Sequence, residues 1–242
     1  MARPTIIIIP GSWHTAEHAH PTVDALRRKG YIAKADQLAS VGLKERRQYF
    51  ADDVAHLHRL VADELDAGRD VCFVLHSYAG QSGAETINRL IHEGRLEASA
   101  GKGRLVRAIF VAAYAFPAGV ALDSRHFLGP ENPNFGIDDE RHLNTMADPE
   151  HVFYNDLPPA ESKRWADKLV PAYYQDATPV ITSEDWRKAP ITVVATKHDI
   201  TIPPARQEMV WQGFELKWVD AGHVPFISQP DAVADIIIKA LS

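Results

Sequence analysis

The stretch Val71-Cys72-Phe73-Val74-Leu75-His76-Ser77-Tyr78-Ala79-Gly80 decides the fold, because it predicts a buried strand that turns directly into a helix. Its first five residues are apolar on both faces, as in a parallel strand that is covered on two sides. A helical pattern follows and continues to about Ile91. Ser77 is then expected on a tight turn, with its hydroxyl above the sheet edge and near the amides that begin the helix. The alternative is that Ser77 is an ordinary serine cap of that helix.

On both sides of this stretch, predicted strands and helices alternate along the chain. The clearest helix covers about 45–67, where apolar residues recur every three or four positions, as in an amphipathic helix. We expect further strands over Thr5–Ile9, from Tyr31, and over Leu105–Ala113, Ile191–Thr196 and Leu216–Val219. We expect further helices over Pro21–Lys29, after Pro204 and from Pro230. Repeated strand–helix units predict an α/β fold, with a mostly parallel central sheet of about six strands flanked by helices.

The alternation stops between Ala118 and Ala189, where proline, aromatic residues and short helical pieces dominate and no strong strand is predicted. One helical piece runs from Pro158 to Val170. We expect this segment, called the insertion below, to form a helical lid over the carboxyl ends of the strands, where ligands of open α/β sheets bind. The core then comprises residues 1–117 and 190–242, and the insertion comprises residues 118–189.

The charge of the chain is unevenly distributed. The insertion contains thirteen acidic and seven basic residues, so the formal net charge of −6 lies on it and the remainder is neutral. If the insertion roofs a binding site, long-range repulsion should modestly disfavour polyanionic substrates. The alternative is that these acidic side chains form an ordinary solvated surface.

Composition excludes several classes of protein. The 242 residues are 45% hydrophobic and 24% charged, which is ordinary for a globular protein. The chain lacks the basic excess that nucleic-acid binding requires, and its single cysteine, Cys72, excludes an intramolecular disulfide. The longest aliphatic run, Ile6–Ile9, is far shorter than the ~18 residues of a membrane span. We therefore expect a cytoplasmic protein with a small-molecule substrate and no nucleic-acid or membrane partner, and a homodimer is left open.

Two further residues complete a catalytic pattern with Ser77. His223 lies in Ala221-Gly222-His223-Val224-Pro225, just after the last predicted strand, and Asp199 follows the strand Ile191–Thr196. Taken alone, His223 fits a surface-loop histidine and Asp199 fits a turn or cap aspartate. Together they give the chain order Ser, Asp, His, each after a strand, which is far more specific than any one member. The pattern predicts a nucleophile, a general base and an acid that orients the base.

Backbone amides should stabilise an oxyanion beside this serine. The amide of Tyr78 is one donor, because it directly follows the nucleophile. We expect the second donor in the loop Pro10-Gly11-Ser12-Trp13, where Gly11 allows a sharp turn and Ser12 supplies its amide.

These motifs together resemble the α/β-hydrolase superfamily, and within it the small esterases of the methylesterase and hydroxynitrile lyase-like branch. The resemblance spans essentially the whole chain and is least specific in the insertion. It implies a serine hydrolase with Ser77 as nucleophile, His223 as base and Asp199 as acid, and with the Ser12 and Tyr78 amides as the oxyanion hole. Leu75 stands where a small residue is usual, and Ala79 where glycine is commoner.

Other polar and aromatic residues are candidates for substrate binding. We predict this role for Gly11, Trp13, His14, His76, Trp165 and Trp186. The insertion adds the aromatic residues Phe127, Phe153, Tyr173 and Tyr174, although aromatic residues in such a segment more often form the core of a lid. His14, His18 and His20 have a spacing that can bind zinc, but a catalytic zinc site needs three rigidly held ligands. We therefore expect no metal and no cofactor.

The leading hypothesis is hydrolysis of a carboxylic ester or lactone of a small, largely apolar substrate through an acyl-enzyme. One alternative is a lyase of the hydroxynitrile type. Members of that branch commonly carry threonine where Gly11 stands and lysine where Val224 stands, and this chain has neither. Another alternative is a small-molecule receptor that keeps the fold, since fold alone does not establish activity.

Overall fold

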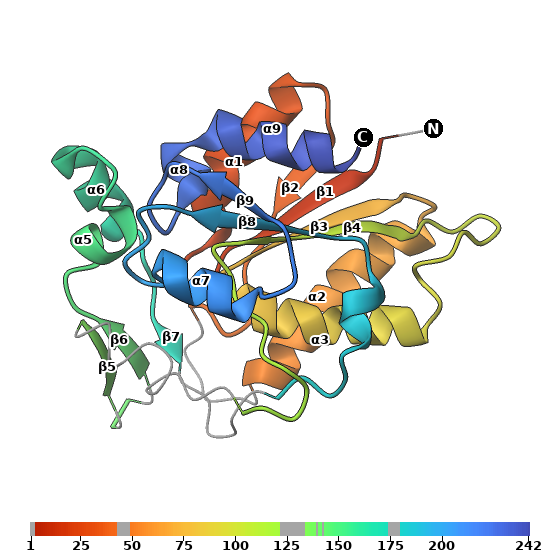
Figure 1. Cartoon of the computed structure of the whole chain (residues 1–242), viewed down its shortest axis with the longest axis horizontal. Coiled ribbons are helices and arrows are strands. Elements are labelled where there is room, and N and C mark those ends of the chain that lie inside the picture. Colours follow the sequence, from red (N-terminus) through yellow and green to blue (C-terminus); the bar gives the residue numbers. More distant parts are fainter. Residues whose placement is uncertain (1–2, 43–48, 122–133, 139, 142, 174–179) are drawn as a thin grey trace.

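A six-stranded parallel sheet forms the centre of the molecule in the computed structural model (Figure 1), which describes residues 3–42, 49–121, 134–138, 140–141, 143–173 and 180–242. The strand order is β2-β1-β3-β4-β8-β9. The strands are β1 (Thr5–Ile9), β2 (Ala33–Ala35), β3 (Val71–His76), β4 (Leu105–Val111), β8 (Ile191–Thr196) and β9 (Leu216–Val219). Because all six run in the same direction, the loops after their carboxyl ends meet at one edge of the sheet.

Helices cover both faces of this sheet (Figure 1). Helices α1 (His20–Arg28) and α9 (Pro230–Ala240) lie on one face, and α2 (Tyr49–Asp66) and α3 (Ala79–His92) on the other. The shorter helices are η1 (Ala16–Ala19), η2 (Asp185–Lys188), α7 (Pro204–Val210) and α8 (Pro225–Ser228). In the part of the chain that the structure describes, no helix combines the length and the apolar character needed to cross a membrane.

Alternating strand residues enter two separate hydrophobic layers. In β1, Ile6 and Ile8 pack in the layer that contains α1 and α9. Ile7 and Ile9 pack in the layer that contains α2 and α3. Because both faces of the sheet are covered, side chains that point to either face are buried. This explains why β1 and β3 have no polar face.

Most predicted elements are confirmed. Strands β1, β8 and β9 have the predicted bounds, and β3 and β4 differ from the prediction only at their carboxyl ends. Strand β2 begins two residues later than predicted, at Ala33. Helix α2 is described from Tyr49, and the part of its prediction that covers 45–48 lies outside the described residues.

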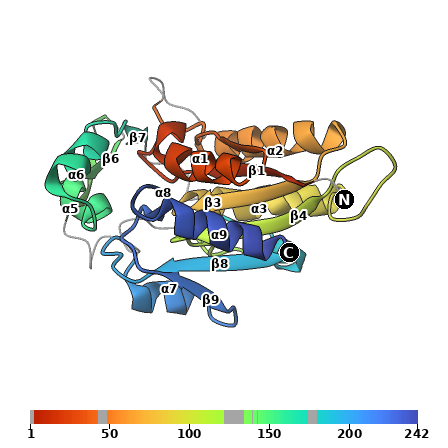
Figure 2. The same ribbon diagram turned by 90° about the horizontal axis from the view of Figure 1, so that it is seen from above.

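The insertion is only partly helical, although its sequence predicts no strong strand. It holds a three-stranded antiparallel sheet of β5 (Phe135–Asp138), β6 (Leu143–Met146) and β7 (Ala172–Tyr173), together with α5 (Pro149–Tyr154) and α6 (Pro159–Ala166). These strands are two to four residues long, too short to show an alternating pattern in the sequence. Figure 2 shows the insertion elements α5, α6, β6 and β7 beyond one end of the central strands.

A buried carboxylate on α2 makes stability depend on pH. The Asp53 carboxylate accepts hydrogen bonds from the Ser40 amide (2.8 Å) and hydroxyl (2.9 Å), and burial raises the pKa of Asp53 from 3.8 to about 7. Because the folded pKa exceeds the unfolded one, this group's contribution is full below about pH 4 and is lost as the pH rises through about 7.

Asp53→Asn should therefore remove part of the pH dependence of stability. Between pH 4 and pH 8, wild type should lose up to about 4 kcal/mol relative to the variant. Urea unfolding of both proteins across this range measures the difference. Parallel stability curves for the two proteins would show that Asp53 is ionised at low pH in the folded state.

Candidate active site

Ser77 occupies a strained turn between β3 and α3. Its φ is +53°, in the left-handed region that non-glycine residues rarely adopt. The Gly80 amide donates to the Ser77 carbonyl at 3.0 Å, so the helical turn begins directly at the serine. Such a turn places the hydroxyl above the sheet edge, as the sequence predicted.

The helix accommodates the large residue that precedes this turn. The Leu75 side chain, which stands where a small residue is usual, lies against Gly83 of α3, and a Cβ at Gly83 would overlap it. Gly80 faces the carbonyl of Tyr114, where a Cβ would lie 2.5 Å from the oxygen. The close approach of strand and helix is therefore preserved by glycine on the helix rather than by a small residue on the strand.

The His223 imidazole lies between Ser77 and Asp199. Its Nε2 is 3.1 Å from the Ser77 Oγ, and its Nδ1 is 2.8 Å from the Asp199 Oδ2. His223 is buried, and the ring of Phe153 packs on it with centroids 5.7 Å apart. The three residues that the sequence grouped, far apart in the chain, are therefore in hydrogen-bond contact.

The loop after β8 fixes the Asp199 carboxylate. Oδ1 accepts hydrogen bonds from the amides of Thr201 and Ile202, each at 2.8 Å, and Oδ2 accepts one from the Thr196 hydroxyl at 3.2 Å. These bonds leave Oδ2 directed at the imidazole. A carboxylate held in this way orients a histidine with its proton on Nδ1.

The loop after β1 passes directly beside the serine. A Cβ at Gly11 would lie 2.6 Å from the Ser77 Cβ and 3.2 Å from its Oγ, so only glycine fits there. Trp13 also has a positive φ, +64°. The Ser12 carbonyl lies 2.7 Å from the His14 Nδ1, which donates to it. The amide of Ser12 thus belongs to a tightly shaped loop at the nucleophile.

The insertion contacts the three loops that follow β1, β8 and β9 at this site. The Trp13 Nε1 donates to the Asn144 carbonyl at 3.0 Å, and the Asn155 side-chain amide donates to the His198 carbonyl at 2.9 Å. The Asp156 carboxylate accepts the Gly222 amide at 2.6 Å, next to His223. Sequence reasoning missed Asn155 and Asp156 as anchors of these loops, since their partners are distant in the chain.

The predicted substrate-binding residues fall into two groups. Gly11 and Trp13 lie at the site, and Trp13 packs on Phe153 with ring centroids 5.5 Å apart. His14 is buried beside Phe153, and burial lowers its pKa well below the usual value.

The structure does not place the other three predicted binding residues on an open surface of the site. Both ring nitrogens of His76 bond to the backbone. Trp165 packs on His18. Trp186 lies in the core beside Phe110, on the α2–α3 face. Phe127, Tyr174 and the Tyr173 side chain lie outside the described residues.

Two of the three histidines with zinc-like spacing, His14 and His18, are engaged in other contacts. The His14 and His18 rings pack edge to face, 4.9 Å apart, and the His18 Nδ1 accepts the Thr15 amide at 3.1 Å. No cluster of three or more His, Cys, Asp or Glu residues suited to a metal is found among the described residues.

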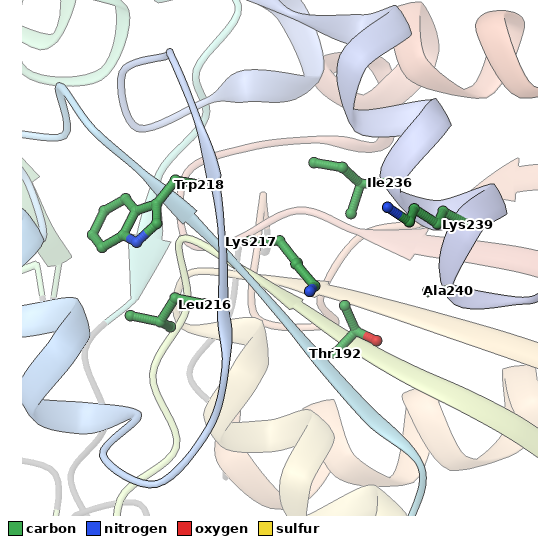
Figure 3. A pocket seen from close by; sticks show the side chains of 7 residues that line it. All are labelled: Thr192, Leu216, Lys217, Trp218, Ile236, Lys239 and Ala240. Atoms are coloured by element: carbon green, nitrogen blue, oxygen red, sulfur yellow. The ribbon is translucent and has the colours of Figure 1, made fainter.

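A separate pocket lies at the opposite edge of the sheet, near the amino ends of β8 and β9 and the last turns of α9 (Figure 3). It is lined by Thr192, Leu216, Lys217, Trp218, Ile236, Lys239 and Ala240. The serine, aspartate and histidine of the site follow the carboxyl ends of their strands, so this pocket is not part of their arrangement.

The fold and this arrangement define the class of protein. Residues 6–236 match the family described as "Alpha/beta hydrolase family", and the chain belongs to that family. This family membership supports hydrolase activity. The resemblance to the α/β-hydrolase superfamily that the motifs indicate is thus confirmed.

Individual relatives extend over the whole chain. The chain is 29% identical over 250 residues to "Alpha/beta hydrolase nvfD" of Aspergillus novofumigatus (strain IBT 16806), covering 99% of this chain and 97% of the relative. The fold resembles polyneuridine aldehyde esterase, with a TM-score of 0.80, 14% identity and full coverage of both chains. It also resembles a pyrethroid hydrolase from Sphingobium faniae JZ-2, with a TM-score of 0.73, 20% identity and coverage of 99% and 98%.

Proposed function

We propose that the protein is a serine hydrolase that cleaves a carboxylic ester or lactone of a small, largely apolar substrate through an acyl-enzyme. The observation that carries this proposal is the hydrogen-bonded series from Ser77 Oγ through His223 to Asp199, with separations of 3.1 and 2.8 Å. Nucleophile, base and orienting acid lie within the reach that proton transfer requires.

The chemistry follows from the protonation states that these contacts favour. Because Asp199 accepts a hydrogen bond from the Nδ1–H of His223, the Nε2 of His223 carries no proton and can take the Ser77 proton as the hydroxyl attacks the substrate carbonyl. His223 then donates that proton to the alcohol oxygen of the substrate as the bond from this oxygen to the carbonyl carbon breaks. The acyl group remains on Ser77. A water molecule, deprotonated by His223, hydrolyses the acyl-enzyme and restores Ser77.

The amides of Ser12 and Tyr78 are the proposed oxyanion donors. Two observations support this proposal: Gly11, which precedes Ser12, lies against Ser77, and Tyr78 is the N-cap of α3 directly after the serine. Preorganised donors of this kind stabilise the charge that develops on the carbonyl oxygen.

An apolar substrate agrees with the side chains near the triad. Trp13 packs on both Phe135 and Phe153, and Phe153 in turn packs on His223. The net negative charge of the insertion, which contacts the catalytic loops, disfavours polyanionic substrates. Two proteins of similar structure, polyneuridine aldehyde esterase and the pyrethroid hydrolase, support hydrolysis as the reaction.

Reaction with a fluorophosphonate probe tests the proposal without knowledge of the substrate. Native protein should be labelled on Ser77, and heat-denatured protein should not, because only the folded site activates the hydroxyl. A panel of esters, lactones and thioesters of graded length then identifies the acyl and alcohol groups. If native protein resists the probe, the fold serves a receptor rather than an enzyme; release of cyanide from a cyanohydrin would instead indicate a lyase.

A further inference from the structure

We propose that His76 is a positioning residue that fixes the general base, His223, and the oxyanion loop relative to each other. This inference rests on the proposed function. The Gly11 amide donates to the His76 Nδ1 at 3.1 Å. On the other side of the ring, Nε2 lies 2.9 Å from the His223 carbonyl. One imidazole therefore joins the loop after β1 to the loop after β9.

Only one state of the His76 ring satisfies both contacts. The Gly11 amide must donate, so Nδ1 is unprotonated, and the His223 carbonyl must accept, so Nε2 carries the proton. A second proton would set an N–H on Nδ1 against the Gly11 N–H. Burial, together with the nearby His223, lowers the pKa of His76 well below the usual value, in agreement with a neutral ring.

The ring is also fixed by packing. His76 is the last residue of β3 and is fully buried. Its centroid lies 4.8 Å from that of His223 and 5.4 Å from that of Phe226 on α8. His76 also directly precedes Ser77 in the chain. This one residue therefore connects the nucleophile to the loop that carries the base and to the oxyanion loop.

This arrangement suits the charge changes of the proposed reaction. His223 becomes positively charged when it takes the Ser77 proton, and a neutral ring beside it adds no charge repulsion, whereas a protonated ring would. The ring also sets where Gly11, and therefore the neighbouring Ser12 amide, lies relative to the serine. Displacements of about 1 Å between reacting groups can cost on the order of 10²-fold in rate.

Two substitutions separate the two contacts. In His76→Asn, the short side chain reaches the position of Nδ1 and can accept the Gly11 amide, but it does not reach the His223 carbonyl. In His76→Gln, the longer side chain reaches the position of Nε2 and can donate to the His223 carbonyl, but it leaves the Gly11 amide without an acceptor. His18 provides matched controls, because this buried ring also accepts an amide on Nδ1, that of Thr15 (3.1 Å), and meets a carbonyl with Nε2, that of Trp165 (3.4 Å).

The experiment measures the fluorophosphonate labelling rate, kcat and KM on a good ester, and Tm. Both His76 variants should label about 10–100-fold more slowly than wild type and lose kcat by a similar factor, with KM nearly unchanged. His18→Asn and His18→Gln should lower Tm comparably and label at the wild-type rate.

Several results would overturn the inference. Wild-type labelling rates in either His76 variant would show that the corresponding contact does not act on the site. Equal slowing in the His18 variants would show that the loss follows general destabilisation. A large rise in KM with unchanged kcat in either His76 variant would show that the ring acts on substrate binding rather than on the position of the base and the oxyanion loop. Failure of wild type to label would reject the proposed function itself, whereas normal wild-type labelling with unaffected His76 variants would reject this inference alone.

Discussion

Ser77→Ala should lower turnover of a good ester by about 10³-fold or more with little change in Tm. The variant removes the Oγ that lies 3.1 Å from His223, so no acyl-enzyme can form and only weak catalysis by the remaining groups is left. The fold should persist, because the side chain at residue 77 fills little of the core. Turnover and Tm are to be measured on the same preparations, together with KM where turnover permits.

Ser82→Ala is the matched control for this loss. Ser82 is buried in α3, five residues further on, and its hydroxyl contacts the Ala79 carbonyl at 3.4 Å. It should keep wild-type turnover. Unchanged turnover in Ser77→Ala would show that another group attacks the substrate and would remove the basis of the proposed acyl-enzyme.

The sheet was predictable because the burial of its central strands produces apolar runs that can be recognised in the sequence. In β1 and β3 every residue is buried, so each strand appears as an unbroken apolar run. The proximity of Ser77, Asp199 and His223 was predictable for a related reason, since parallel strands bring the residues after their carboxyl ends to one edge. The chain order Ser77, Asp199, His223 could therefore be proposed before any distance was known.

The insertion was less predictable because its structure depends on contacts with the core. Strand β7 has only two residues and pairs with β6. Nothing local in a two-residue strand distinguishes it from a loop. The contacts of Asn155 and Asp156 with the loops of His198 and Gly222 likewise join positions far apart in the chain.

The aromatic and histidine side chains show the limits of assigning roles by residue type. Trp186 and Trp13 were both predicted to bind substrate. Trp186 packs in the core against Phe110 and Trp211, whereas Trp13 lies in the loop beside the serine. The position of His76 next to Ser77 suggested contact with substrate, but both of its nitrogens bond to backbone groups 65 and 147 residues away in the chain. Sequence pattern places such residues near the site but does not assign their partners.

Asp199→Asn should lower kcat on the order of 10³–10⁴-fold while KM changes little. Two backbone amides that bond to the Asp199 carboxylate explain why this isosteric substitution should lower kcat so strongly. The Thr201 and Ile202 amides donate to Oδ1, so they require the oxygen of the asparagine amide at that position. The NH₂ group then occupies the place of Oδ2 and donates to His223. Nδ1 of His223 must become an acceptor, the proton moves to Nε2, and the imidazole can no longer take the Ser77 proton.

Asp220→Asn separates this tautomer effect from the loss of any histidine–carboxylate pair. His198 and Asp220 form such a pair at 2.8 Å, but both side chains are exposed, and an exposed pair contributes little. This control should retain wild-type kcat and Tm. An Asp199→Asn variant within about tenfold of wild type would mean that the His223 tautomer is set by another group. NMR observation of the His223 ring nitrogens measures the tautomer directly, and it should show the proton on Nδ1 in wild type and on Nε2 in the variant.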